Sequence, residues 1–184
     1  MNTSNCVKLL EVKSTIHPLL TNVQTTYIDS FPETERRDFN LFCKLLTNEE
    51  RFRLYVILYN EEYAGFITLW QFEGFYYVEH FAIDSAFRSG GIGSVAMTKV
   101  KDMLDTNIIL EVEDPIDDLT KRRVRFYEAL GFCIVDANYK QPPYREGDSW
   151  YDMKLMSFGE LEMKKEYERV RDCIYEYVYN IKKA

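Results

Sequence analysis

The 184-residue sequence predicts a single mixed α/β domain whose central, mostly antiparallel sheet is flanked by helices. Three observations support this prediction. Apolar residues make up 46% of the chain and charged residues 29%, a composition typical of a globular protein with a core. Several β-rich runs follow one another between residues 53 and 83, separated by turn residues. Beyond this point, helical periodicity alternates with short apolar runs.

The first half of the chain is expected to contain a strand, two helices and a three-stranded meander. The expected strands are Val7–Val12, Arg53–Tyr59, Tyr63–Phe72 and Tyr76–Ile83, and the expected helices run from Pro18 to about Asp29 and from Glu33 to about Leu46. Pro32 separates the two helices, because proline disfavours helical backbone in the residue before it. Asn60-Glu61-Glu62 and Gly74 mark the turns between the last three strands.

The second half alternates between helices and strands. The helices are expected at Ile92–Leu104, at Leu119–Leu130 and in the tail Gly159–Ala184, and the strands at Ile108–Val112, Phe132–Ala137 and Trp150–Phe158, with a loop at Asn138–Ser149. Gly131 ends the second of these helices, since the left-handed backbone there is accessible to glycine. The tail helix carries an apolar stripe, for which packing on the same chain is the first expectation and a homodimer interface the second.

Charge and cysteine usage restrict the class of function. The formal net charge of −7 argues against a nucleic-acid partner, which requires a cationic face. The four cysteines lie far apart, without metal-type spacing, and Cys6, Cys133 and Cys173 are expected to behave as small apolar residues. The sequence shows no signal peptide and no apolar run of membrane-spanning length. We therefore expect a cytoplasmic protein without a bound metal and without membrane association.

A glycine-rich loop between a strand and a helix is the sharpest chemical signal. Its residues are Arg88, Ser89, Gly90, Gly91, Ile92, Gly93 and Ser94. Glycines allow a ligand to approach the backbone, and the first turn of a helix offers N–H groups to an anion. The loop lacks the Lys-Ser/Thr pair of nucleotide-hydrolysing P-loops, and the antiparallel strands before it do not fit a dinucleotide-binding unit. The alternative interpretation is a tight structural turn.

Two motifs together resemble the GNAT N-acetyltransferase family. Arg88-x-x-Gly91-x-Gly93 resembles the family's pyrophosphate loop, and Phe126–Phe132 (Phe-Tyr-Glu-Ala-Leu-Gly-Phe) resembles its second signature. The resemblance covers about residues 50–158 and implies one GNAT domain over residues 1–184; the C-terminal helix, residues 159–184, lies outside the matching motifs. Two positions depart from the family pattern, where Thr120 and Arg123 replace the usual asparagine and small residue.

The resemblance implies a role for each matching position, with acetyl-CoA as co-substrate. The backbone amides of Arg88–Ser94 would hold its pyrophosphate. Phe81, Ala82 and Ile83 would pair with the pantetheine arm, and a β-bulge there would point an N–H at the thioester carbonyl. Tyr127 would protonate the departing thiolate, which suits a phenol with a pKa near 10. The alternative role for Tyr127 is core packing.

A base is also required, because an alkylammonium must lose a proton before it can attack. With a pKa near 10.4, reaching the neutral amine at pH 7 costs about 4.6 kcal/mol. Glu79 is the first candidate, on the same strand as Phe81, provided that its pKa is raised or that a water relays the proton. His80 is a weaker candidate, because strand alternation turns it to the opposite face. Water alone is the third alternative.

The resemblance also implies that the acceptor enters between two segments of the chain, residues 31–38 and residues 141–145. In the first, Arg36 or Arg37 would suit a substrate carboxylate, whereas Glu33, Glu35 or Asp38 would suit a second ammonium. A charged helix start is the simpler interpretation of each residue taken alone. We expect a primary amine of a small molecule as acceptor, with a non-catalytic acetyl-CoA sensor and a protein N-acetyltransferase as alternatives.

Overall fold

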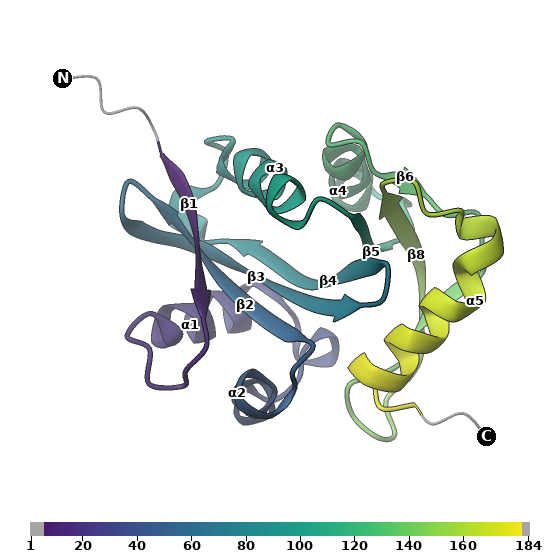
Figure 1. Cartoon of the computed structure of the whole chain (residues 1–184), viewed down its shortest axis with the longest axis horizontal. Coiled ribbons are helices and arrows are strands. Elements are labelled where there is room, and N and C mark those ends of the chain that lie inside the picture. Colours follow the sequence, from purple (N-terminus) through teal and green to yellow (C-terminus); the bar gives the residue numbers. More distant parts are fainter. Residues whose placement is uncertain (1–5, 182–184) are drawn as a thin grey trace. The chain divides into compact units, whose positions relative to one another are not determined.

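The computed structural model describes residues 6–181, which fall into two compact units. The first unit comprises the chain up to Gln71 together with Val78–Asp105. The second comprises Phe72–Tyr77 and the chain from Thr106 onward. Figure 1 labels the elements of both units.

The first unit is a layer of antiparallel strands with helices on both faces (Figure 1). Its strands are β1 (Val7–Val12), β2 (Phe52–Tyr59), β3 (Glu62–Phe72) and the later part of β4 (Phe75–Ile83), in the order β1-β2-β3-β4. Its helices are α1 (Leu20–Ser30), α2 (Phe39–Asn48) and α3 (Ile92–Leu104), with short 3-10 turns η1 (Glu33–Glu35) and η2 (Ser85–Phe87). The β2–β3 hairpin turns at Asn60 and Glu61, both with positive φ, as the sequence predicts.

Each face of these strands has its own core. On the α3 face, Ile92 and Ala96 pack against Val7 of β1, Ile57 of β2 and Ala64 of β3. On the α1 and α2 face the core is aromatic. Its rings belong to Tyr27, Phe31, Phe39, Phe42, Phe52, Phe66, Trp70 and His80. Burial of several large rings fixes α1 and α2 against β2, β3 and β4.

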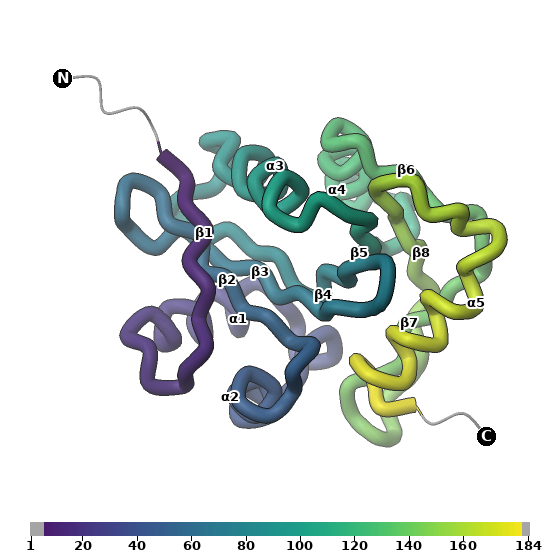
Figure 2. Tube along the Cα trace, in the orientation of Figure 1, coloured from purple at the N-terminus to yellow at the C-terminus, as the bar shows by residue number. Residues whose placement is uncertain are grey.

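The second unit is built around β8. Its elements are β5 (Asn107–Glu113), α4 (Asp118–Glu128), β6 (Cys133–Ile134), β7 (Tyr139–Gln141), β8 (Tyr151–Phe158), α5 (Met163–Cys173) and a π-helical turn, η3 (Ile174–Val178). β5, β6 and β7 all pair antiparallel with β8. In Figure 2, β7 runs beside the C-terminal helix, where the Tyr175 hydroxyl donates to the Lys140 carbonyl (2.5 Å). The apolar stripe of the tail is buried within this unit, at Met163, Val170, Ile174 and Val178.

The predicted mixed α/β fold, with mostly antiparallel strands and flanking helices, is confirmed. One predicted helix is interrupted, however. Residues 33–46 form the turn η1 and the helix α2 rather than one helix, because Arg36 is extended and the Asp38 side chain caps α2 by accepting from the Asn40 N–H (2.7 Å).

Four further expectations are corrected. The predicted strand Phe132–Ala137 is reduced to two residues, and the predicted loop that follows contains the strand β7. The tail helix ends in a π-helical turn instead of continuing regularly. Cys6 and Cys133 are exposed and Cys173 is half-buried, so the apolar runs around these thiols do not bury them. Within residues 6–181, no helix combines the length and apolar character needed to cross a membrane.

Candidate active site

The glycine-rich loop opens helix α3 through left-handed backbone. Ser89 (φ 68°) and Gly91 (φ 74°) both have positive φ, and Gly91 is the N-cap residue of α3. Apart from its chain neighbours and the backbone of its own helix, no atom lies within 4 Å of the position that a Cβ on Gly91 would occupy. The first-turn N–H groups of a helix lack intrahelical partners. The loop therefore presents backbone donors and open space, as anion binding requires.

The end of β4 is tied to this loop and to β3. The Arg88 side chain donates from Nε to the Ile83 carbonyl (2.9 Å) and from a terminal nitrogen to Ser30 Oγ (3.2 Å). A Cβ on Gly65 of β3 would lie 2.3 Å from the Ala82 carbonyl oxygen, so only glycine permits this approach of the two strands. On the other side of β3, the pairing with β2 has an irregularity between Ile57 and Leu58. The predicted binding residues Phe81–Ile83 and Arg88–Ser94 thus adjoin one another in the first unit.

Glu79 lies in a closed, charged environment. Its side chain is fully buried and forms an ion pair with Arg37, whose side chain is 8% exposed. The Trp70 indole donates to the second carboxylate oxygen (2.8 Å). Burial alone would raise the pKa of Glu79, but Arg37, His80 and the hydrogen bonds outweigh it, so the pKa lies below its usual value. The requirement of a raised pKa for a directly acting base is not met.

The Arg37 side chain, which the sequence offered for a substrate carboxylate, is instead bound inside the protein. Its backbone N–H donates to the Tyr27 hydroxyl (3.0 Å), and its guanidinium lies 5.9 Å from the Trp70 ring centre. The neighbouring Arg36 donates from Nε to the Phe31 carbonyl (3.0 Å). The connection between α1 and α2 is therefore held by its own arginines.

His80 also contacts this connection, although strand alternation predicted the face opposite to Glu79. His80 Nε2 lies 3.2 Å from the Glu35 carbonyl oxygen. Because a carbonyl only accepts, Nε2 carries the hydrogen. Burial lowers the pKa of His80, which is therefore neutral near pH 7. Its ring packs edge-on against Tyr27 and Phe31.

Tyr127 lies in the second unit, on the last turn of α4. It is 8% exposed, and its ring packs against Phe126 and Phe132. Burial raises its pKa to about 12, so the phenol stays protonated across the physiological range. Thr120 forms a capping box with Asp117 at the start of the same helix. Arg123, the second departure from the family pattern, is exposed and pairs with Glu113.

A second carboxylate, Glu111 on β5, was not among the predicted site residues. It accepts hydrogen bonds from Tyr139, from Gln141 Nε2 (2.6 Å) and from the Tyr179 hydroxyl (2.8 Å). Burial raises its pKa, and these hydrogen bonds, with one from Tyr77, oppose the rise. Its sequence signal was a glutamate inside the apolar run Ile108–Val112. These contacts connect β5 with β7 and with the C-terminal segment.

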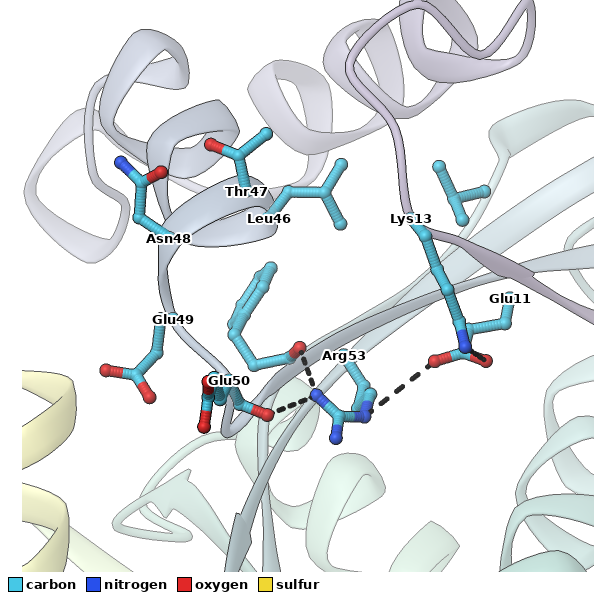
Figure 3. Close-up of a pocket in the computed structure, with 10 residues that line it drawn as sticks. Glu11, Lys13, Leu46, Thr47, Asn48, Glu49, Glu50 and Arg53 are labelled. Carbon is cyan, nitrogen blue, oxygen red and sulfur yellow. Dashed lines mark hydrogen bonds and ion pairs between the residues drawn. The ribbon is translucent and has the colours of Figure 1, made fainter.

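The first unit also contains an open cavity of about 580 Å³ (Figure 3). The end of α2, the start of β2 and the end of β1 line it, with Glu11, Lys13 and Arg53 on one side. The Arg53 guanidinium is already held by the Phe52 carbonyl (3.0 Å) and by Gln71 (3.3 Å). None of the residues that line it belongs to the predicted site, so the cavity is not assigned to it.

The comparisons with known proteins agree with the motifs. A family model described as the acetyltransferase (GNAT) family matches residues 17–132. A putative GNAT-family acetyltransferase from Bacteroides thetaiotaomicron is similar over 95% of this chain and 99% of its own, with 34% identity and a TM-score of 0.92. No curated protein sequence matches the chain significantly.

More distant solved structures share the fold. The ribosomal-protein-S18-alanine N-acetyltransferase from Escherichia coli is 17% identical, covers 85% of this chain and 98% of its own, and has a TM-score of 0.60. A GNAT acetyltransferase from Elizabethkingia anophelis, solved with acetyl-CoA bound, is 17% identical, covers 84% and 98%, and has a TM-score of 0.57. The family model and the 34% identical relative show that the chain belongs to the GNAT acetyltransferase family.

Proposed function

We propose that this chain transfers the acetyl group of acetyl-CoA to a primary amine of a small molecule. The observation that carries this proposal is the loop Arg88–Ser94, where left-handed Ser89 and Gly91 open helix α3 with space for a ligand. Family membership supports acetyl transfer, and the solved GNAT structure with bound acetyl-CoA supports the donor. In the proposed complex the loop amides bind the pyrophosphate, and Phe81–Ile83 pair with the pantetheine arm.

In the proposed reaction the neutral amine attacks the thioester carbonyl directly. A C–N bond forms, the C–S bond breaks, and the amine gives up a proton to water. Tyr127 gives its phenolic proton to the departing thiolate and regains one from solvent. A tyrosine that stays protonated at neutral pH suits a proton donor. Glu79 stays a prediction as base, and its ion pair with Arg37 favours water in that role.

There are two alternative functions: a sensor that binds acetyl-CoA without transferring its acetyl group, and an enzyme that acetylates a protein. A non-catalytic acetyl-CoA sensor would bind the donor and release no free CoA with any amine. A protein N-acetyltransferase would prefer a peptide N-terminus over free amines; the Escherichia coli neighbour is named for acetylation of an alanine of ribosomal protein S18. The acceptor class is therefore tested with small amines and a peptide side by side.

The donor is tested by thermal stability with saturating acetyl-CoA, in comparison with NAD and ATP. At a 100-fold excess over the dissociation constant, binding stabilises the protein by about 2.7 kcal/mol. We expect this shift with acetyl-CoA alone, and its absence would contradict the proposed donor site.

Two substitutions at Gly91 test the loop itself. At φ 74° both Gly91→Ala and Gly91→Glu strain the backbone, but only the glutamate places a negative charge beside the predicted pyrophosphate. We expect Gly91→Glu to abolish the acetyl-CoA shift and Gly91→Ala to weaken it. Normal binding by Gly91→Glu would show that the loop is only a structural turn.

A further inference from the structure

Resting on the proposed function, we propose that Glu79 is a positioning residue: through Arg37 it holds the segment Phe31–Asp38, on the predicted acceptor side, against β4 and thereby sets the KM for the acceptor amine. The carboxylate would then act on the acceptor indirectly, without taking its proton. The proposal concerns the side of the site that family membership leaves open.

The segment has little regular structure of its own. It contains the three-residue turn η1, after which Arg36 is extended, and α2 begins only at Phe39. Side chains provide most of its attachment to the rest of the first unit. Arg37 pairs with Glu79, its backbone N–H donates to Tyr27, and the Glu35 carbonyl meets His80. Glu79 and His80 are consecutive residues of β4, so this strand fixes the segment at two points.

The ion pair is costly to break because both charges are largely removed from water. The Arg37 side chain is 8% exposed and that of Glu79 is fully buried. If the segment moved away, it would leave a buried carboxylate without its counter-ion, which is strongly unfavourable. The segment therefore cannot detach from β4 without breaking this pair.

The geometry also places the segment near the predicted donor. Glu79 precedes Phe81, the first residue predicted to bind the pantetheine arm, by two positions on β4, which corresponds to roughly 7 Å along a strand. A segment fixed at Glu79 is thereby fixed relative to the thioester. Glu33, Thr34 and Asp38 are exposed on the same segment. Their positions depend on the ion pair between Arg37 and Glu79.

Both oxygens of Glu79 are engaged by donors, Oε1 by Arg37 and Oε2 by Trp70. Burial would raise the pKa of this carboxyl, but the Arg37 charge, the neighbouring His80 and two hydrogen bonds outweigh burial and hold it below its usual value. A carboxylate in this state has no vacant oxygen directed at an ammonium and little affinity for a proton. These contacts are typical of a residue that holds a segment in place.

A double substitution separates the two roles. We would compare Arg37→Met, Glu79→Met and the Arg37→Met/Glu79→Met double variant, since a buried ion pair can often be replaced by apolar side chains of similar size. Each single variant should raise the KM for the amine at least tenfold, while the KM for acetyl-CoA changes less than twofold. The double variant should return the KM for the amine to within about threefold of the wild-type value. If kcat instead falls in Glu79→Met and is not restored in the double variant, Glu79 is the base and the proposal is wrong.

Amide hydrogen exchange gives a readout that does not require activity. In either single variant, exchange over residues 31–38 should accelerate at least tenfold, and the double variant should slow it again. Arg51→Met, which breaks the exposed pair with Glu49, is the matched control and should leave that segment unchanged. Unchanged exchange in both single variants would show that the Arg37–Glu79 pair does not hold the segment in place. A wild-type protein that acetylates no amine would refute the proposed function, while the exchange data would still show whether the pair holds the segment.

Discussion

The two units each contain a glutamate on a strand, and the two carboxylates have opposite environments. Glu79 on β4 pairs with the Arg37 guanidinium, and its pKa is lowered. Glu111 on β5 accepts hydrogen bonds from the neutral side chains of Tyr139, Gln141 and Tyr179, and its pKa is raised. Burial acts in the same direction on both. The difference comes from the partners, because neutral donors offset desolvation less than a counter-ion does.

This comparison shows that neither residue type nor burial indicates what a carboxylate does. The sequence favoured Glu79 as the base from its position before Phe81, yet its partners keep it ionised and occupied. Glu111 has the raised pKa that was expected of a base, but its donors come from β7 and the C-terminal segment. We interpret both residues first as anchors, each joining segments that are far apart in the sequence.

The largest effect is expected when the charge of Glu79 is removed. Glu79→Gln leaves the buried Arg37 guanidinium without a counter-ion, so we expect the free energy of unfolding to fall by about 3–5 kcal/mol. Chemical denaturation at pH 7 measures this loss. The control is Glu61→Gln, whose partner Lys8 is exposed, and it should change stability little. Equal effects of the two substitutions would show that burial of the Arg37–Glu79 pair has no energetic consequence.

A smaller effect, confined to catalysis, is expected in the second unit. Tyr127→Phe keeps the buried ring and removes only the hydroxyl. We expect kcat to fall at least tenfold, which corresponds to about 1.4 kcal/mol in the barrier, while acetyl-CoA affinity is retained. Steady-state kinetics and a binding titration together measure this. Tyr167→Phe on α5 is the control, and unchanged turnover in Tyr127→Phe would assign Tyr127 to core packing.

The smallest effect, and the most direct test of the comparison, is in pH dependence. The lowered pKa of Glu79 means that its contribution to stability is present above its unfolded pKa, near 4.5, and is lost as the pH falls through the folded value. The raised pKa of Glu111 has the opposite sign. Its ionisation destabilises the fold increasingly as the pH rises from about 4.5 through the folded value.

Unfolding curves of Glu79→Gln and Glu111→Gln between pH 3 and 8 test these signs. Relative to wild type, the deficit of Glu79→Gln should shrink as the pH falls, whereas Glu111→Gln should gain stability as the pH rises. Each pKa unit of difference between folded and unfolded states contributes about 1.4 kcal/mol. If stability changed with pH in the same way in both variants, the pKa values of Glu79 and Glu111 would not be shifted in opposite directions.

Patterns among residues close together in the sequence were sufficient to predict most of the helices and strands. Runs of β-favouring residues located β1, β2, β3 and β4, and Gly74 and Gly131 marked turns because both adopt positive φ. The same local signals located the loop before α3 and placed Tyr127 on a helix. Such features depend on residues close together in the chain, so the sequence by itself determined them, and with them the family.

Only the tertiary structure decided what each charged side chain contacts. Arg37, which lies between η1 and α2, pairs with Glu79, 42 positions away in the chain. The short strand β7 exists because β8 pairs with it, within a stretch whose prolines and glycine predict a loop. The pKa of Glu111 depends on Tyr179, 68 positions away. Pairing and desolvation across such separations leave no periodic signal in the sequence, because they depend on where the folded chain brings two distant side chains together.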